Sequence, residues 1–381
     1  METPFSIILF FKIQLFFSKY IILFFHWIIK LFYKNRTAYI IAVCLPINYF
    51  QKNRGKMKLI NENKINFGLF DYPLDEFNYK DYILTTPFNK KARGFKKRLN
   101  QFHFTGICGE RFMIGIAIVD LKLITSGFFY IYDKKTNDLI DRSKIGFPSK
   151  RKRYIEKNPE NTNSLFQSGK FNISFRGGDI KVADKGVEIE LKLNQAKTPL
   201  RLCTRTGYKG WTYTQKELPL SIKMGSLKIN NNSYTLKSPE YFALSDWTCG
   251  HMRRNTFWNW ASSTCKLPCG RTFGLNLSCG VNETSFTENA FWIDGNMTKV
   301  DSVDFLFDKI GEKWLIQSYD KKVNLSFHPI HVRKDKLNAL IFASNFSQIS
   351  GIFNGTVRTE SGENIKIESC PGWTEDHYAK W

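Results

Sequence analysis

Two carboxyl side chains in the C-terminal half of the chain stand among aromatic and apolar residues. Alternate residues of a strand share one face, which places Glu288 on the same face as Trp292. In the same way, Asp246 shares a face with Leu244. A carboxyl group in such surroundings is poorly hydrated, so its pKa rises and it is suited to act as a general acid. The pattern predicts Asp246 and Glu288 as catalytic residues that divide the acid and base roles of one pocket.

A structural role is the alternative for both carboxyl groups. Arg253 and Arg254 lie in the same segment as Asp246. A guanidinium group or a set of backbone amides would hold either carboxylate in its charged form. The residues alone leave the two interpretations open.

Aromatic residues accompany these carboxyl groups. If residues 254–260 form a strand, Arg254, Trp258 and Trp260 share a face on which the guanidinium can lie over the indole rings. Such a face suits an apolar or aromatic ligand, and the alternative is a core cluster of Trp with a structural Arg. The predicted ligand-binding residues are Trp247, Arg254, Trp258, Trp260, Asn276, Asn289 and Trp292.

Zinc binding is the other chemistry that the side chains suggest. Cys249, His251, Cys265, Cys269 and Cys279 lie within about thirty residues. Their spacing differs from the paired short knuckles of structural zinc sites. We therefore expect no bound metal, and we expect the reduced, buried cysteines that are usual in a cytosolic protein.

Motifs for bound cofactors are missing from the sequence. It contains neither a Gly-rich phosphate-binding loop nor the nucleophile elbow of serine hydrolases. Nucleotide-dependent and serine-hydrolase chemistries are therefore disfavoured, and no cofactor is expected.

The charge of the chain raises the question of an anionic partner. The 381 residues carry a formal net charge of +22, with denser basic runs at 90–98 and 150–153. Neither run fits a zinc-finger, basic-zipper or RNA-recognition pattern, so we expect no nucleic-acid partner. An anionic membrane surface stays open as a partner.

The elements that must position these side chains are strands. From Asn61 onward apolar residues recur at every second position, as in Phe171, Ile173 and Phe175, with turn residues between the runs. The pattern predicts an all-β chain, and barrels or sandwiches dispose of the sheet edges in such a chain. We expect two in tandem, a first half at 57–212 and a second at 213–381.

The hydrophobic N-terminal segment, 1–56, has a different pattern. Residues 7–33 are nearly all apolar or aromatic, and Lys12, Lys19, His26 and Lys30, which interrupt them, fall on one stripe of a helix. The longest part free of Lys, Tyr20–Ile29, is shorter than the roughly 18 residues of a confident membrane span. A tilted or interfacial membrane helix is one interpretation.

A late translation start is the other interpretation. Arg54 and Gly55 can be encoded by a purine run like a bacterial ribosome-binding site, close before Met57. We expect a cytoplasmic protein if translation starts at Met57, and association with a membrane through 7–33 if the full chain is made.

Several short motifs occur together in a characteristic order. They are Phe70-Asp71-Tyr72-Pro73-Leu74, Tyr213-Thr214-Gln215-Lys216, Asp246-Trp247-Thr248, Trp258-Asn259-Trp260-Ala261, Gly274-Leu275-Asn276-Leu277, Thr287-Glu288-Asn289 and Phe327-His328-Pro329. From about Phe67 to Trp381 the chain resembles the bacterial family called domain of unknown function 2804. That family has no established activity.

A more distant likeness bears on fold and activity. The chain is similar to the tandem lipocalin-like barrels of carotenoid hydratases and tocopherol cyclases. This resemblance implies two lipocalin-like barrels, a lipid or isoprenoid-like apolar ligand, and a hydratase or cyclase that uses a buried carboxylic acid. The alternative is a non-enzymatic lipid carrier or sensor with the same pocket.

Overall fold

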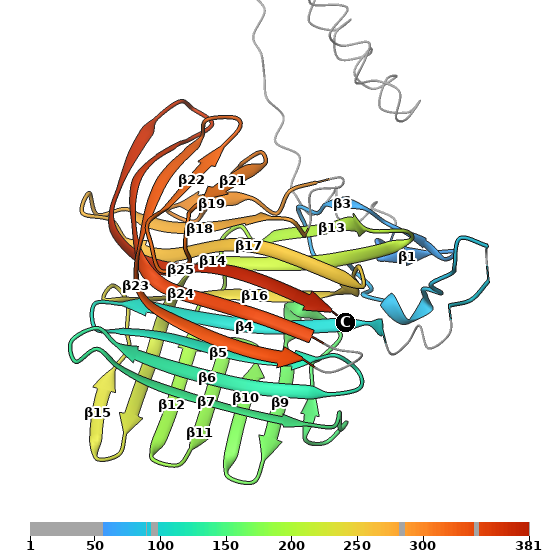
Figure 1. Ribbon diagram of the computed structural model, residues 1–381, viewed down its shortest axis with the longest axis horizontal. Coiled ribbons are helices and arrows are strands. Elements are labelled where there is room, and N and C mark those ends of the chain that lie inside the picture. The colour runs from blue at the N-terminus through green and yellow to red at the C-terminus, as the bar shows by residue number, and fades with distance from the viewer. Residues whose placement is uncertain (1–55, 89, 93–97, 282–285, 339–342, 381) are drawn as a thin grey trace, which may run out of the picture. The chain divides into compact units, whose positions relative to one another are not determined.

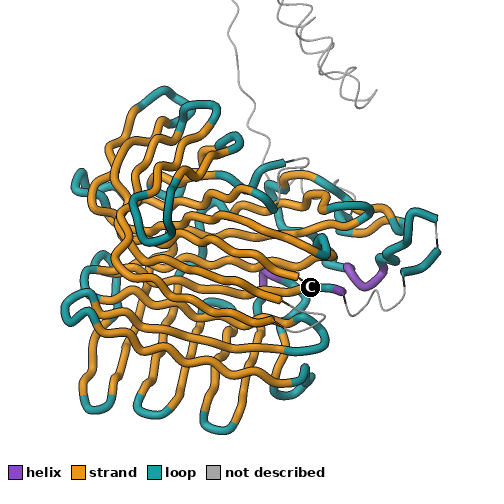
Figure 2. Tube along the Cα trace, viewed as in Figure 1, coloured by secondary structure: helices purple, strands orange, loops and turns teal. Residues whose placement is uncertain are grey.

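Antiparallel strands make up nearly all the regular structure of the computed structural model (Figure 1, Figure 2). The structure describes residues 56–380 except 89, 93–97, 282–285 and 339–342. Short 3-10 turns such as η1 (Tyr79–Asp81) and η3 (Pro159–Asn161) are helical, and these described residues contain no α-helix. The prediction of an all-β chain is confirmed.

The N-terminal segment falls almost wholly outside this range. Residues 1–55 are not among those described, so the membrane-helix and late-start interpretations stay predictions. Within the described part of the chain, no helix has the length and apolar character needed to cross a bilayer.

The first sheet has 14 strands and curves into a nearly closed barrel. From edge to edge it runs β7 (Asp138–Gly146), β6 (Thr125–Asp133), β5 (Phe112–Asp120), β4 (Asn100–Gly109), β16 (Tyr241–His251), β14 (Gly210–Ile229), β12 (Val187–Leu193), β11 (Asp179–Asp184), β10 (Phe171–Arg176), β9 (Asn163–Ser168) and β8 (Arg153–Tyr154). Strand β13 (Leu200–Thr206) pairs with β14 and with β3 (Gly68–Leu69), and β15 (Asn232–Thr235) pairs with β14.

The second sheet has nine strands and forms a half-barrel. Its order is β20 (Asn296–Lys299), β19 (Ala290–Ile293), β18 (Thr272–Cys279), β17 (Asn255–Lys266), β25 (Asn364–Lys380), β24 (Ala343–Arg358), β23 (Val323–Asn338), β22 (Trp314–Ser318) and β21 (Val303–Leu306). A separate pair joins β1 (Ile60–Asn61) to β2 (Lys64–Ile65).

The chain passes from the first sheet to the second between β16 and β17. The division expected from the sequence, between residues 212 and 213, falls inside β14. That strand is 20 residues long and pairs along its length with β12, β13 and β16, so it belongs to the first sheet throughout.

Alternation along the strands builds the core of the first sheet. In β10 the side chains of Phe171, Ile173 and Phe175 are buried, and the residues between them are more exposed. Segment 57–84, which precedes the long strands, adds Leu59 to the same core. Residues from the start of the described chain therefore help to fill the space that the first sheet encloses.

The two sheets approach each other closely at Gly106. The ring of Trp373, on β25, lies over the backbone of Gly106, on β4, where a Cβ atom would come within 2.6 Å of the ring. A side chain at position 106 would therefore require the ring of Trp373 to shift. Buried residues of both sheets, among them Leu244 and Trp260, extend this contact.

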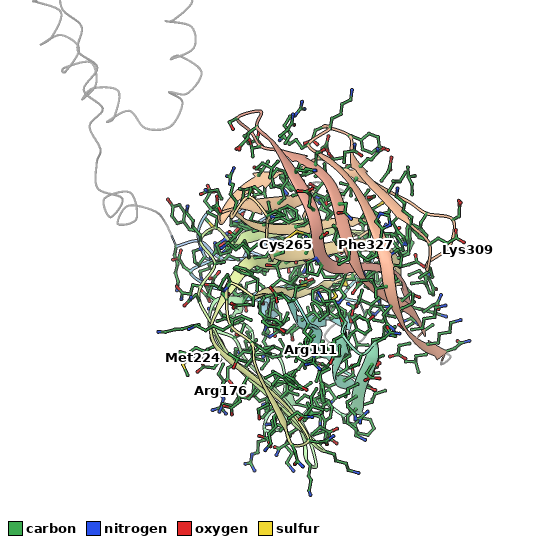
Figure 3. All side chains as sticks on the ribbon, turned by 90° about the vertical axis from the view of Figure 1, so that its left-hand side faces the viewer. Arg111, Arg176, Met224, Cys265, Lys309 and Phe327 are labelled. Carbon is green, nitrogen blue, oxygen red and sulfur yellow. A yellow bond between two sulfur atoms is a disulfide. The ribbon has the colours of Figure 1, made fainter. Side chains whose placement is uncertain are left out.

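A disulfide bond joins two strands of the second sheet. It links Cys265 of β17 to Cys370 of β25, whose Cα atoms are 6.0 Å apart, and Figure 3 labels Cys265 in this sheet. The prediction that the cysteines are reduced is wrong for this pair. Cys370 is 105 residues away along the chain, so local spacing gave no sign of it. Among the described residues no three His, Cys, Asp or Glu side chains gather as a metal site.

Candidate functional site

A cavity of about 420 Å³ lies between the two sheets. Aromatic and aliphatic side chains make most of its wall. From the first sheet these include Phe102, Phe104, Ala117, Val119 and Phe128, and from the second sheet Trp258, Trp260 and Phe346. A space of this size and character is typical of small-molecule sites.

Strand pairing places the residues of the first-sheet wall side by side. Lys216 of β14 lies opposite Asp246 of β16, which in turn lies opposite Phe104 of β4. The same row continues through Ala117 to Phe128. Because directly paired residues of neighbouring strands share a face, all five side chains point toward the second sheet.

The second-sheet wall is built in the same way. Trp258 of β17 lies opposite His377 of β25, and Trp260 lies opposite Glu375. Gln348 of β24 lies on the other side of Glu375. The C-terminal strand therefore carries a carboxyl group and an imidazole into the middle of this wall.

One buried ammonium group holds two carboxylates. Lys216 Nζ is 2.5 Å from Asp246 Oδ2 and 3.5 Å from Glu288 Oε1. The side chains of Lys216 and Glu288 are each 4% exposed, whereas that of Asp246 is 20% exposed. Thr248 Oγ1 donates a hydrogen bond of 3.0 Å to Asp246 Oδ1. Asp246 is thus the member of this cluster that is open to a ligand.

Opposing effects set the protonation of this cluster. Burial lowers the pKa of Lys216, but attraction to Asp246 and Glu288 outweighs burial and raises that pKa above its ordinary value. Burial raises the pKa of Asp246, against the opposing attraction of Lys216. Lys216 is therefore a cation at neutral pH.

A second lysine fixes the backbone on both sides of Glu288. Lys299 Nζ donates hydrogen bonds to the carbonyl oxygens of Thr287 at 2.8 Å and Asn289 at 2.7 Å. Asn276 Nδ2 donates to the carbonyl oxygen of Glu288 itself at 2.9 Å. Burial lowers the pKa of Lys299 to about 8. These bonds position Glu288 without occupying its carboxylate.

Glu375 differs from the two carboxylates that share Lys216. Its oxygens accept hydrogen bonds from Trp258 Nε1 at 3.0 Å and Gln348 Nε2 at 2.7 Å. The Gln348 amide oxygen accepts a hydrogen bond from Tyr130 of the first sheet, which fixes the orientation of the amide. Burial raises the pKa of Glu375 to about 7 although both hydrogen bonds act to lower it. A large fraction of this carboxyl group therefore holds its proton at neutral pH.

His377 is next to Glu375 on the same face. Its ring packs against that of Trp258 with centroids 4.1 Å apart and the planes tilted by 55°, and Nε2 is 2.9 Å from Ser344 Oγ. Burial lowers the pKa of His377 to about 3, so the imidazole is neutral at physiological pH.

Four of the nine predicted site residues line the cavity. They are Asp246, Glu288, Trp258 and Trp260. Glu288 precedes β19 and so lies in a loop, not in the strand from which its face was inferred. The partner of both carboxylates is Lys216, not either of the arginines considered from the sequence.

The other five predicted residues lie outside the cavity wall. Trp247 packs on the opposite face of β16, where its ring meets Phe77 at 5.3 Å between centroids. Arg254 is exposed and precedes β17. The prediction that Arg254 shares a strand face with Trp258 and Trp260 required a strand that includes residue 254. The strand begins one residue later, at Asn255.

The last three residues support their neighbours. Asn276 accepts a hydrogen bond from Trp260 Nε1 at 2.9 Å, and Asn289 accepts one from the Ser278 backbone at 2.7 Å. Trp292 Nε1 donates to the Thr198 carbonyl oxygen at 2.7 Å. Their polar groups are thus engaged inside the protein.

The polar wall residues that sequence reasoning missed include Lys216, Glu375 and His377. A signal exists for Lys216, because a Lys in phase with Thr212 and Thr214 within a strand pattern is unusual. Glu375 and His377 likewise alternate with Trp373. No local pattern indicates that the strand of Lys216 and the strand of Glu375 and His377 face each other.

Comparison with known proteins gives a family and distant similarities of fold. The crystal structure of kievitone hydratase from Nectria haematococca is 11% identical over 74% of this chain and 88% of that chain, with a TM-score of 0.44. The structure of CghA with Sch210972 is 8% identical over 86% of this chain and 97% of that chain, with a TM-score of 0.46. No curated protein sequence matches. The family model described as "Domain of unknown function (DUF2804)" matches residues 54–381, and the chain therefore belongs to the DUF2804 family.

Proposed function

We propose that this protein binds a largely apolar small molecule between its two sheets and adds water, or an internal hydroxyl group, across a carbon–carbon double bond. The observation that carries the proposal is the position of Glu375. This carboxyl group forms part of an aromatic cavity wall, and burial raises its pKa to about 7. It can therefore act as a proton donor, because much of it is still protonated near neutral pH.

The proposed reaction begins with proton transfer from Glu375 to one carbon of the double bond. The positive charge that develops on the neighbouring carbon is stabilised by the faces of Trp258 and Trp260. The oxygen of water or of the ligand's own hydroxyl group then forms a bond to that carbon. Its proton returns to the Glu375 carboxylate, which restores the acid. The net change is hydration or ring closure, with no oxidation.

Lys216, Asp246 and Glu288, here called the Lys216 cluster, form the polar part of the cavity wall. Asp246 is the more exposed of its two carboxylates and accepts a hydrogen bond from the attacking oxygen. Glu288, fixed by Lys299 through its backbone, balances the charge of Lys216. In this proposal Glu375 takes the role of acid that the sequence suggested for Asp246 or Glu288, and Asp246 positions the nucleophile.

A trapping experiment tests the proposal. The full chain and its Glu375→Gln variant are purified from the same host. The apolar molecules that co-purify are then extracted, and their masses are measured by mass spectrometry. Gln keeps the shape of the side chain but removes the acid, so the variant should hold substrate while the wild type holds product. Hydration predicts a mass difference of one water, and ring closure predicts equal mass with a different retention time.

The matched control is Glu363→Gln, which changes an exposed surface carboxylate paired with Arg271. This control should carry the same molecule as the wild type. If all three proteins hold one identical molecule, catalysis is contradicted and the protein is a carrier.

A further inference from the structure

The open side of the cavity is bordered by exposed apolar side chains. Ile145, at the end of β7, and Leu337, near the end of β23, line the cavity and are 64% and 39% exposed. Phe147, two residues beyond Ile145, is 77% exposed. We call these three residues the mouth patch. Large apolar side chains this exposed, at the entrance of an apolar cavity, indicate a surface that something apolar covers.

The segments that carry the mouth patch are rich in basic residues. Segments 141–153 and 333–337 together contain nine Lys and Arg and two Asp. Two of the basic residues have acidic partners: the buried Arg333 pairs with Asp141 at 2.7 Å, and Arg142 pairs with Asp184 at 3.8 Å. The turn that carries the basic run folds back on the patch, since Arg153 donates to the carbonyl oxygen of Phe147 at 3.2 Å. The surroundings of the patch are therefore strongly cationic.

We propose that the mouth patch docks on an anionic phospholipid bilayer. Each Lys or Arg near such a surface contributes about 1 kcal/mol of attraction, and exposed aromatic and aliphatic side chains insert at the boundary of headgroups and acyl chains. Docking rests on this charge and exposure alone. The consequence that an apolar ligand passes between bilayer and cavity without crossing water also rests on the proposed function.

Hydrogen–deuterium exchange of the full chain tests the docking, because its readout is local to each peptide. Peptides covering 143–153 and 333–338 should exchange more slowly with vesicles of phosphatidylcholine and phosphatidylglycerol than with phosphatidylcholine alone. Added salt should weaken this protection, since it screens the attraction. Binding of another part of the chain to the vesicles leaves this readout unchanged.

Matched variants complete the experiment. Phe147→Asp should lose the vesicle-dependent protection at both segments. Met224→Asp changes a residue of β14 that is 65% exposed, lies outside the cavity wall, and is labelled on the first sheet in Figure 3. This control should keep the protection.

Three outcomes would overturn the proposal: no protection at these segments, equal protection by the uncharged vesicles, or protection that appears without vesicles as protein concentration rises. The last outcome would make the patch an interface between copies of the chain. If docking fails while the wild type and Glu375→Gln still carry different molecules, only the docking proposal is lost. If both proteins carry one molecule and docking persists, only catalysis is lost.

Discussion

Buried charged side chains are paired differently in the space that the first sheet encloses and in the space between the two sheets. In the first, Arg201 holds Glu160 through two hydrogen bonds, at 2.6 and 3.0 Å, and the nearby Glu217 accepts a hydrogen bond of 3.0 Å from the amide of Gln215. In the second, Lys216 faces two carboxylates, and Glu375 stands nearby as a third carboxyl group. A matched pair is a structural solution, whereas an excess of carboxyl groups beside a cavity is costly unless a ligand uses it.

The two spaces also differ in how they are filled, although one strand serves both. On β5, Ile114 and Ile116 join the core that the first sheet encloses. Ala117 and Val119, on the other face, line the cavity. On this strand, therefore, the larger side chains fill the enclosed core and smaller ones border the cavity. This difference supports our proposal that the ligand binds between the sheets and not inside the barrel.

The largest effect is expected from Lys216→Met. Removing the ammonium group leaves the buried Glu288 and the partly buried Asp246 without the cation that they share, which should cost about 3–5 kcal/mol of unfolding free energy. Chemical denaturation measures the change. Lys181→Met is the control, because that lysine pairs with Glu190 on an exposed face and such pairs contribute about 0.2–1 kcal/mol. Equal losses in the two variants would remove the distinction between the clusters.

A matched pair of leucines compares the packing of the two spaces. Leu59 is fully buried in the enclosed core, whereas Leu121 lines the cavity. Leu59→Ala should destabilise the protein by about 2–4 kcal/mol, since it leaves a hole in a packed core. Leu121→Ala should cost less than about 1.5 kcal/mol, because that side chain already borders open space. The midpoints of urea unfolding measure the loss of stability in each variant. A larger loss for Leu121→Ala than for Leu59→Ala would contradict the difference in packing.

Glu375 should make stability depend on pH in a defined window. Its pKa is raised from an ordinary 4.5 to about 7, so between these values the folded protein keeps a proton that the unfolded chain releases. Stability relative to Glu375→Gln should therefore fall as pH rises through this window, by up to about 1.4 kcal/mol per pH unit, and level off above it. Lys216 and Asp246 face Glu375 and are present in both proteins. Melting curves with parallel pH profiles would show that Glu375 is already ionised.

Local pattern predicted the strands well and the site only in part. Alternation in β10 is readable because each face of a strand meets one environment along its whole length. The aromatic setting of Asp246 and Glu288 likewise marked both as buried carboxyl groups that share one site.

What the sequence concealed depends on the order of strands in the sheets. Glu375 reaches Trp258 only because β25 pairs with β17, more than a hundred residues earlier in the chain. Lys216 reaches Glu288 only because the two sheets face each other there. The disulfide of Cys265 follows from the same long-range pairing. No local signal reports such contacts, so the acid and the cation of the site could not be assigned from spacing.

Binding of N-phenyl-1-naphthylamine, an apolar probe that fluoresces when it leaves water, tests most directly whether the cavity between the sheets is the ligand site. Ser126 lines this cavity, whereas Ser174 lies on β10 outside its wall. The comparison requires that both variants have the same melting temperature. Ser126→Trp should then weaken binding of the probe at least about tenfold, a loss of about 1.4 kcal/mol, because the indole ring fills the cavity. Ser174→Trp should bind as the wild type does. Unchanged affinity in Ser126→Trp would contradict the account, because the probe would then be bound elsewhere.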